Sequence, residues 1–151
     1  MASYVESVIA HRLQVSRYLH QIAQELMERG NTHDRSKLGP EELPLYEKLA
    51  PQFATVTYGS IEYQGLLDEL GPALAHHYAH NRHHPEHHDE GIAGMNLVDI
   101  VEMVCDWLAV MAASKSDITH SLTINANRFG IDSQLLSIIN TTIYHLKDGI
   151  D

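Results

Sequence analysis

The pattern that most constrains the fold is a long segment, residues 3–29, whose apolar side chains recur at helical spacing. Val8, Val15, Leu19 and Ile22 follow one another at intervals of seven, four and three residues, which places them on one side of an α-helix. Gly30 follows the segment, so we predict that it ends the helix as a left-handed cap residue. The chain is therefore expected to begin with one long amphipathic helix.

The rest of the chain divides into shorter helical segments separated by glycine and proline. The expected helices cover 40–50, 60–70 with a restart at 72 and an end near 84, 96–113, 116–129 and 132–147. Pro51 and Pro85 are expected to stop helices, whereas Asn96 with Asp99 resembles a helix cap. A strand within 51–59 would have no obvious partner. We predict an all-α fold, a single-domain bundle of about six helices over residues 1–151.

Composition excludes several classes of function. A formal charge of −10 argues against general nucleic-acid binding, which normally requires a basic face. No apolar run approaches the roughly 20 residues of a membrane span, and the N-terminus lacks the pattern of a secretory signal. The single cysteine, Cys105, fits a reducing compartment. A cytoplasmic protein without membrane association is expected, and homo-oligomers are possible.

Three groups of residues suggest metal binding. His33 and Asp34 are adjacent, seven of the 12 histidines lie between residues 76 and 88, and Glu102 and Asp106 are four positions apart in an apolar helix. Neutral imidazoles and carboxylates are the usual ligands of divalent metals, and a buried acid is costly unless it is paired or coordinates a metal.

Each group also has a plainer interpretation. Asp34 suits the start of a helix, and the histidine run can be an exposed polar tract. Glu102 or Asp106 can form a salt bridge with Arg12 or Arg17, and His11 can be a core histidine held by one hydrogen bond.

The order of these residues resembles that of a known superfamily. His…His-Asp…Asp is the ligand order of the HD-domain metal-dependent phosphohydrolases, which are all-helical. His33-Asp34-Arg35-Ser36-Lys37 is similar to the His-Asp-x-x-Lys motif of a two-metal subgroup, with Ser36 in place of the usual glycine. The chain also resembles a small family of uncharacterised phage and bacterial proteins that share His-Asp-x-Ser-Lys-Leu, Asn-x-His-His-Pro-Glu-His and Glu-Met-x-x-Asp-Trp.

The HD resemblance implies a set of site residues. The first metal would be held by His11, His33, Asp34 and Asp106. Asp34 would bridge to a second metal, held by His77 and by His83 or His84. From the chemistry of such a metal site we expect Asp34, Lys37 and Glu86 to be catalytic, and Arg35, Lys37, Asn81 and Arg82 to contact the substrate.

The expected function is hydrolysis of a nucleotide or another small phosphate ester by water that one or two divalent metals activate. The metal is Mn, Fe, Co, Zn, Ni or Mg. Two alternatives stay open: a catalytically silent HD-like module that binds a metal or nucleotide, and a non-hydrolytic metal-binding helical bundle.

Overall fold

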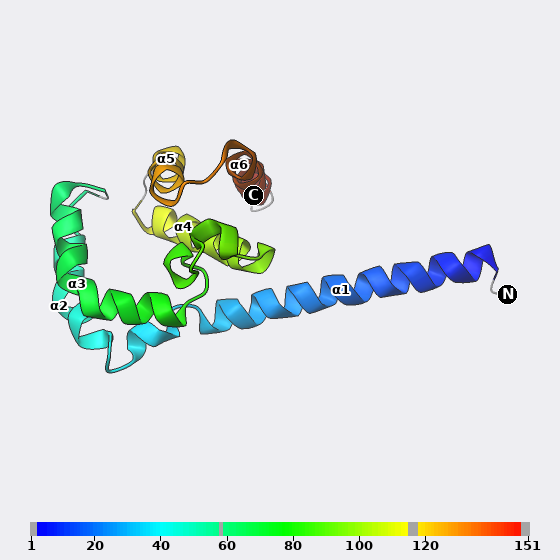
Figure 1. The fold of residues 1–151 in the computed structure, drawn as a ribbon, viewed down its shortest axis with the longest axis horizontal. Coiled ribbons are helices and arrows are strands. Elements are labelled where there is room, and N and C mark those ends of the chain that lie inside the picture. The colour runs from blue at the N-terminus through cyan, green and yellow to red at the C-terminus, as the bar shows by residue number, and fades with distance from the viewer. Residues whose placement is uncertain (1–2, 58, 115–117, 149–151) are drawn as a thin grey trace. The chain divides into compact units, whose positions relative to one another are not determined.

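The fold is all-α. A computed structural model describes residues 3–57, 59–114 and 118–148. Within these ranges the regular elements are six α-helices and three short 3-10 helices (Figure 1). The prediction of an all-α fold with about six helices is therefore confirmed.

The chain divides into two compact units, Met1–His33 and Asp34–Asp151. That residues 1–151 form a single domain stays a prediction.

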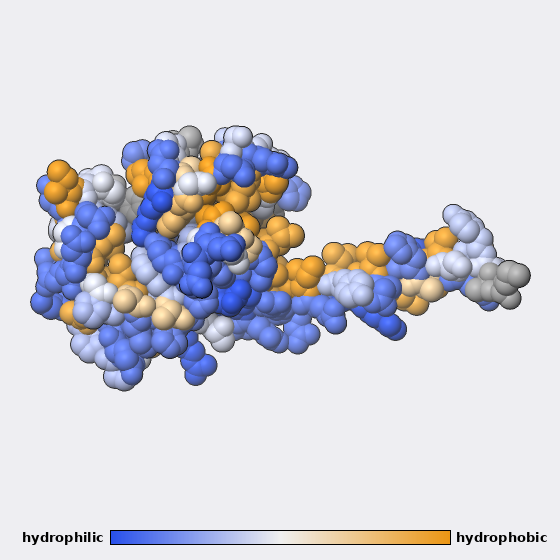
Figure 2. Space-filling view, in the orientation of Figure 1, coloured by the Kyte–Doolittle hydropathy of each residue, from blue (hydrophilic) through white to orange (hydrophobic). Residues whose placement is uncertain are grey.

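The first unit consists of one helix, α1 (Tyr4–Thr32). The Ser3 hydroxyl accepts a hydrogen bond from the Glu6 backbone, and the Glu6 carboxylate accepts one from the Ser3 backbone, so a capping box starts α1. Apolar residues follow one side of the helix (Figure 2). None of its residues is buried, because a single helix has no second layer of its own to cover that side.

The prediction that Gly30 ends α1 is wrong. The helix continues through Gly30 to Thr32. The positive φ angle occurs instead at Asp34, with φ 55°, and no other described residue except glycine has one. Thr32 supports the extra turn because its hydroxyl donates to the Glu28 carbonyl.

The second unit begins with a 3-10 helix, η1 (Arg35–Leu38), followed by α2 (Leu43–Phe53) and α3 (Ile61–His80). Leu49 of α2 and Leu70 and Ala73 of α3 form a buried cluster. α2 starts three residues later than expected and continues past Pro51, which lies in its last turn. α3 continues through Pro72, and its direction changes part-way along (Figure 1), as expected where a proline removes a helical hydrogen bond.

α3 ends at His80, four residues before the expected end. Asn81 has an extended backbone, and residues 81–84 lead into η2 (Pro85–His87) and η3 (Gly91–Gly94). All four residues before Pro85 therefore lie outside a helix, although Asn81 and His84 continue the helical pattern. The histidines at 83 and 84 therefore lie on a loop.

Three helices complete the unit: α4 (Leu97–Ser114), α5 (Ile118–Phe129) and α6 (Ser133–Asp148). The expected cap of α4 is confirmed, since Asn96 Oδ1 accepts from the Asp99 backbone and Asp99 Oδ2 accepts from the Asn96 backbone. Residues 116 and 117 of the expected fifth segment lie outside the described residues. The buried core shared by these helices is Met103, Val104, Leu122, Ile131, Ile139 and Ile143. Among the described residues, no helix combines the length and apolar character that a membrane crossing requires.

Candidate metal centre

Four side chains of the second unit bring their ligand atoms together. One ligand atom from each of Asp34, His77, His83 and His84 lies within 4.8 Å of the others. Asp34 precedes η1, His77 belongs to the last turn of α3, and His83 and His84 lie on the following loop. The group is mostly enclosed, because His77 and His83 are each 1 % exposed.

The distances within this cluster match those between ligands of one cation. His77 Nε2 is 3.2 Å from Asp34 Oδ1 and 2.9 Å from His84 Nε2, and His83 Nε2 is 3.5 Å from the same Asp34 oxygen. Two donor atoms about 2.1 Å from one metal lie roughly 3.0 Å apart at right angles and roughly 3.4 Å apart at the tetrahedral angle. Three nitrogens and one carboxylate oxygen therefore fit a divalent metal.

The backbone of Asp34 places its carboxylate at the centre of the cluster. Its left-handed conformation is one that Asp and Asn tolerate better than most residues. While Oδ1 faces the two histidines, Oδ2 accepts a 2.5 Å charge-assisted hydrogen bond from Lys37 Nζ. Lys37 also lies 5.3 Å from the centre of the Tyr46 ring. Lys37 thus fixes the carboxylate and adds positive charge beside the cluster.

A buried carboxylate orients His77. Glu42 is fully buried, and its Oε2 lies 3.0 Å from His77 Nδ1, while its Oε1 lies 2.7 Å from His76 Nδ1. When Nδ1 donates its proton to Glu42, Nε2 presents a lone pair toward Asp34. Burial alone would raise the pKa of Glu42, but hydrogen bonds from His76 and Ser36 and the charge of His77 outweigh it and lower that pKa.

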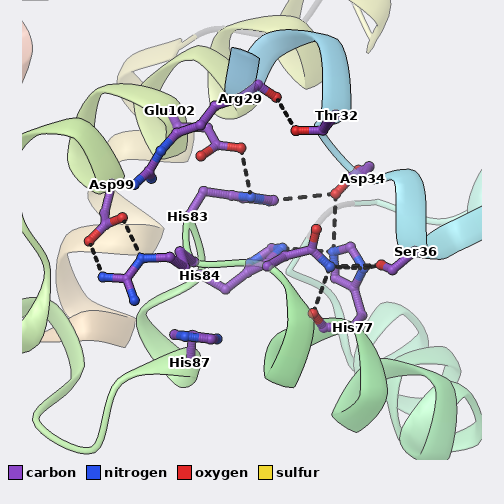
Figure 3. A network of polar contacts seen from close by, with 12 residues as sticks. Arg29, Thr32, Asp34, Ser36, His77, His83, His84, His87, Asp99 and Glu102 are labelled. Atoms are coloured by element: carbon purple, nitrogen blue, oxygen red, sulfur yellow. Dashed lines mark hydrogen bonds and ion pairs between the residues drawn. The ribbon is translucent and has the colours of Figure 1, made fainter. Parts of the chain in front are cut away.

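His83 has the same arrangement with a different acid. Its Nδ1 lies 3.3 Å from Glu102 Oε1 on α4, and its Nε2 faces Asp34. In Figure 3, Glu102 contacts His83, His83 contacts Asp34, and His77 contacts the same aspartate. Carboxylate–histidine pairs of this kind fix ring orientation and raise the basicity of metal ligands.

His84 is kept neutral. Burial, together with the neighbouring His83 and His77, lowers its pKa to about 2. The ring also packs against Tyr78, with centroids 4.9 Å apart. A neutral imidazole with an available nitrogen is a metal ligand rather than an acid at neutral pH.

Several residues predicted to contact substrate or take part in catalysis have partners in the structure. Asn81 Nδ2 donates to Ser36 Oγ and to the His77 carbonyl, so this side chain supports the cluster. The Arg82 guanidinium forms two hydrogen bonds with buried Asp99. The Glu86 carboxylate lies 2.6 Å from Arg128 on α5.

Among the other predicted residues, Arg35 is exposed on η1. Asp106 is partly buried on α4, and one of its oxygens lies within 4.8 Å of an Asp34 oxygen. His11 is an exposed residue in α1, and His33 is the cap residue that follows α1. Because His11 and His33 belong to the first unit, their role as metal ligands stays a prediction.

The chain matches, over residues 1–147, a family described as a family of unknown function, DUF5662. It belongs to that family. No curated protein and no solved structure matches the chain.

Glu42 is a residue of the cluster's surroundings that was not predicted from the sequence. The adjacent acids Glu41 and Glu42 look like helix-start residues that favour the positive end of the helix dipole. In the structure Glu41 is exposed whereas Glu42 is buried. Leu43-Pro44 directly afterwards is a signal of the helix start, since proline in the first turn places Glu42 at the cap position. It does not indicate that Glu42 is buried.

Proposed function

We propose that the chain binds a divalent transition metal through Asp34, His77, His83 and His84 and hydrolyses a small phosphate ester beside it. The observation that carries this proposal is the paired geometry of His77 and His83. Both direct Nε2 toward Asp34 Oδ1, and both present Nδ1 to an acid, Glu42 or Glu102. Nitrogen-rich ligand sets favour zinc, iron, nickel or copper over magnesium or calcium.

The chain's own residues have defined parts in this reaction. Glu42 and Glu102 hold the two rings in the tautomer that exposes Nε2. Lys37 supplies a cation next to Asp34, where it can attract a phosphoryl oxygen. A bound divalent cation supplies Lewis acidity toward the phosphoryl group and makes water more acidic. The resemblance to HD-domain phosphohydrolases supports the reaction class.

One observation favours a second candidate, a metal-binding module without turnover. All three residues assigned to catalysis take part in ion pairs, Asp34 with Lys37 and Glu86 with Arg128. In a silent module these pairs would serve only to stabilise the site.

Metal analysis combined with an activity panel tests the proposal. Purified protein is stripped with a chelator, reloaded separately with Zn, Mn, Fe, Co or Ni, and assayed for bound metal and for phosphate release. We expect at least one tightly bound metal ion per chain and hydrolysis of at least one phosphate ester. Metal binding without hydrolysis of any mono- or diester would select the silent module.

The matched variants are Asp34→Asn and Asp89→Asn. Asparagine tolerates the left-handed backbone at position 34 but lacks the charge, so Asp34→Asn should lose the metal and the activity. Asp89 is exposed on the loop after η2, and its variant should retain both. Full metal content in Asp34→Asn would refute the ligand assignment.

A further inference from the structure

A cleft beside the metal cluster has the composition of a binding site for a flat, largely apolar group. It has a volume of about 750 Å³ and lies between α3, η2 and α5, within the range of small-molecule pockets. Leu67 and Leu74 of α3 and Ile124 of α5 contribute apolar surface, and the rings of Tyr63 and Tyr78 line the same cleft. Gly71 adds no side chain, and a Cβ built there meets nothing within 4 Å.

The polar groups of the cleft are suited to a hydrogen-bonding edge rather than to a phosphate. Gln64 Nε2 donates to Asp68 Oδ1, 3.1 Å away, and Arg128 is paired with Glu86. Two carboxylates and one guanidinium leave a net negative charge along the lining. This part of the site therefore disfavours an anion and offers acceptors to N–H groups of a neutral ligand.

Tyr78 connects the cleft with the metal cluster. Its hydroxyl accepts a hydrogen bond from Arg128 Nη2 at 3.2 Å. Its ring packs against His84, whose Nε2 belongs to the cluster. A ligand lying along Tyr78 can thus have one end in the cleft and the other end at the cluster.

We infer that the cleft binds the base of a nucleoside phosphate whose phosphate group lies at the metal cluster. A purine or pyrimidine is flat, which suits stacking on the tyrosines. Its edge presents N–H donors to the acceptors of Asp68 and Gln64, and it is neutral, which suits the negative lining. The phosphate end of this inference rests on the proposed metal site. The base end rests on the cleft alone.

Calorimetric titration of the zinc-loaded full chain tests the inference without requiring turnover. The probes are adenosine and cytidine 5′-monophosphate, ribose 5-phosphate, which lacks the base, and 1-naphthyl phosphate, which lacks the hydrogen-bonding edge. At least one nucleotide should bind tenfold or more tightly than both comparison compounds. Equal Kd values for ribose 5-phosphate and both nucleotides would overturn the base site, and equal values for 1-naphthyl phosphate would overturn recognition of the edge.

Two glycines of α3 provide matched variants. A Cβ at Gly71 or at Gly65 meets nothing within 4 Å, and only Gly71 lines the cleft. Because the space around each Cβ is open, both proteins are expected to fold. Leucine favours the helix at Gly65, whereas at Gly71 the following Pro72 offsets that gain. Gly71→Leu should weaken nucleotide binding at least tenfold and leave ribose 5-phosphate unaffected, whereas Gly65→Leu should change neither. Unchanged nucleotide binding in Gly71→Leu would place the base elsewhere.

The metal-free protein separates this inference from the proposed function. Adenosine and cytidine carry no phosphate, so their binding to the cleft needs no metal. Nucleoside binding that Gly71→Leu abolishes would support the cleft even if no ester were hydrolysed. Hydrolysis of simple esters with neither nucleoside nor nucleotide binding would retain the metal site and overturn the cleft.

Discussion

Replacing Glu42 by glutamine should weaken metal binding although Glu42 lies outside the proposed ligand set. The carboxylate is fully buried and faces His77 Nδ1 at 3.0 Å and His76 Nδ1 at 2.7 Å. Glutamine has nearly the same shape, but it lacks the charge and offers one acceptor atom in place of two. Its NH₂ group would then face a histidine N–H, a contact between two donors.

The size of the effect follows from these two contacts. Loss of a carboxylate that orients a ligand histidine typically costs about 10- to 100-fold in metal affinity, or about 1.4 to 2.7 kcal/mol. The metal-free protein also loses one hydrogen bond to a charged group, which is expected to lower the free energy of unfolding by about 2 kcal/mol.

Competition with a chromophoric chelator at neutral pH measures the metal affinity, and urea unfolding of the stripped protein measures stability. Glu41→Gln is the control, since Glu41 is the exposed neighbour of Glu42. Equal metal affinity in Glu41→Gln and Glu42→Gln would refute the idea that Glu42 orients a ligand.

Three further predictions concern stability in the metal-free protein. Arg82→Ala should lower the free energy of unfolding by about 2 kcal/mol, because buried Asp99 loses its partner. The loss is smaller than the roughly 3–5 kcal/mol for a fully buried pair, since the Arg82 side chain is 49 % exposed. Unchanged stability in urea would instead leave Arg82 available to a ligand. Because the folded pKa of His84 is about 2 and its ordinary value is 6.5, the unfolded chain takes up a proton first as the pH falls. Stability should therefore decrease below pH 6.5, by on the order of 2 kcal/mol at about pH 5, and thermal melts of His84→Gln should show a weaker decrease. Gly30→Ala should raise the stability of α1 by about 0.5–1 kcal/mol. The helical circular dichroism signal on heating measures this change. A destabilised helix would mean that residue 30 has a left-handed backbone.

Much of the fold follows from local patterns that the sequence displays directly. Asn96 and Asp99 satisfy each other within one turn, so the start of α4 could be predicted without knowledge of the rest of the chain. Gly30 misled the prediction because glycine permits a left-handed turn but does not require one. The backbone at that point depends on Thr32 and Asp34 as well.

The site could be predicted by residue type but not by pairing. Histidines 83 and 84 stand out in a dense run, whereas the partner of each ring comes from another part of the chain. Glu42 is 35 residues from His77 in sequence, and nothing local indicates that it is buried. The sequence predicts Arg82 as a substrate contact, whereas the structure pairs it with Asp99, and that pairing depends on how α4 packs after the loop.

The two acids behind the cluster also link the site to the cooperativity of the second unit. Glu42 precedes α2, whose core contains Leu49 and Leu70, while Glu102 belongs to α4, whose core contains Met103 and Ile139. An ion bound by His77 and His83 would therefore link α2 and α3 with α4, although the two groups of helices have separate hydrophobic cores. Calorimetry should show one sharp melting transition with the ion bound and a broader or double transition after its removal.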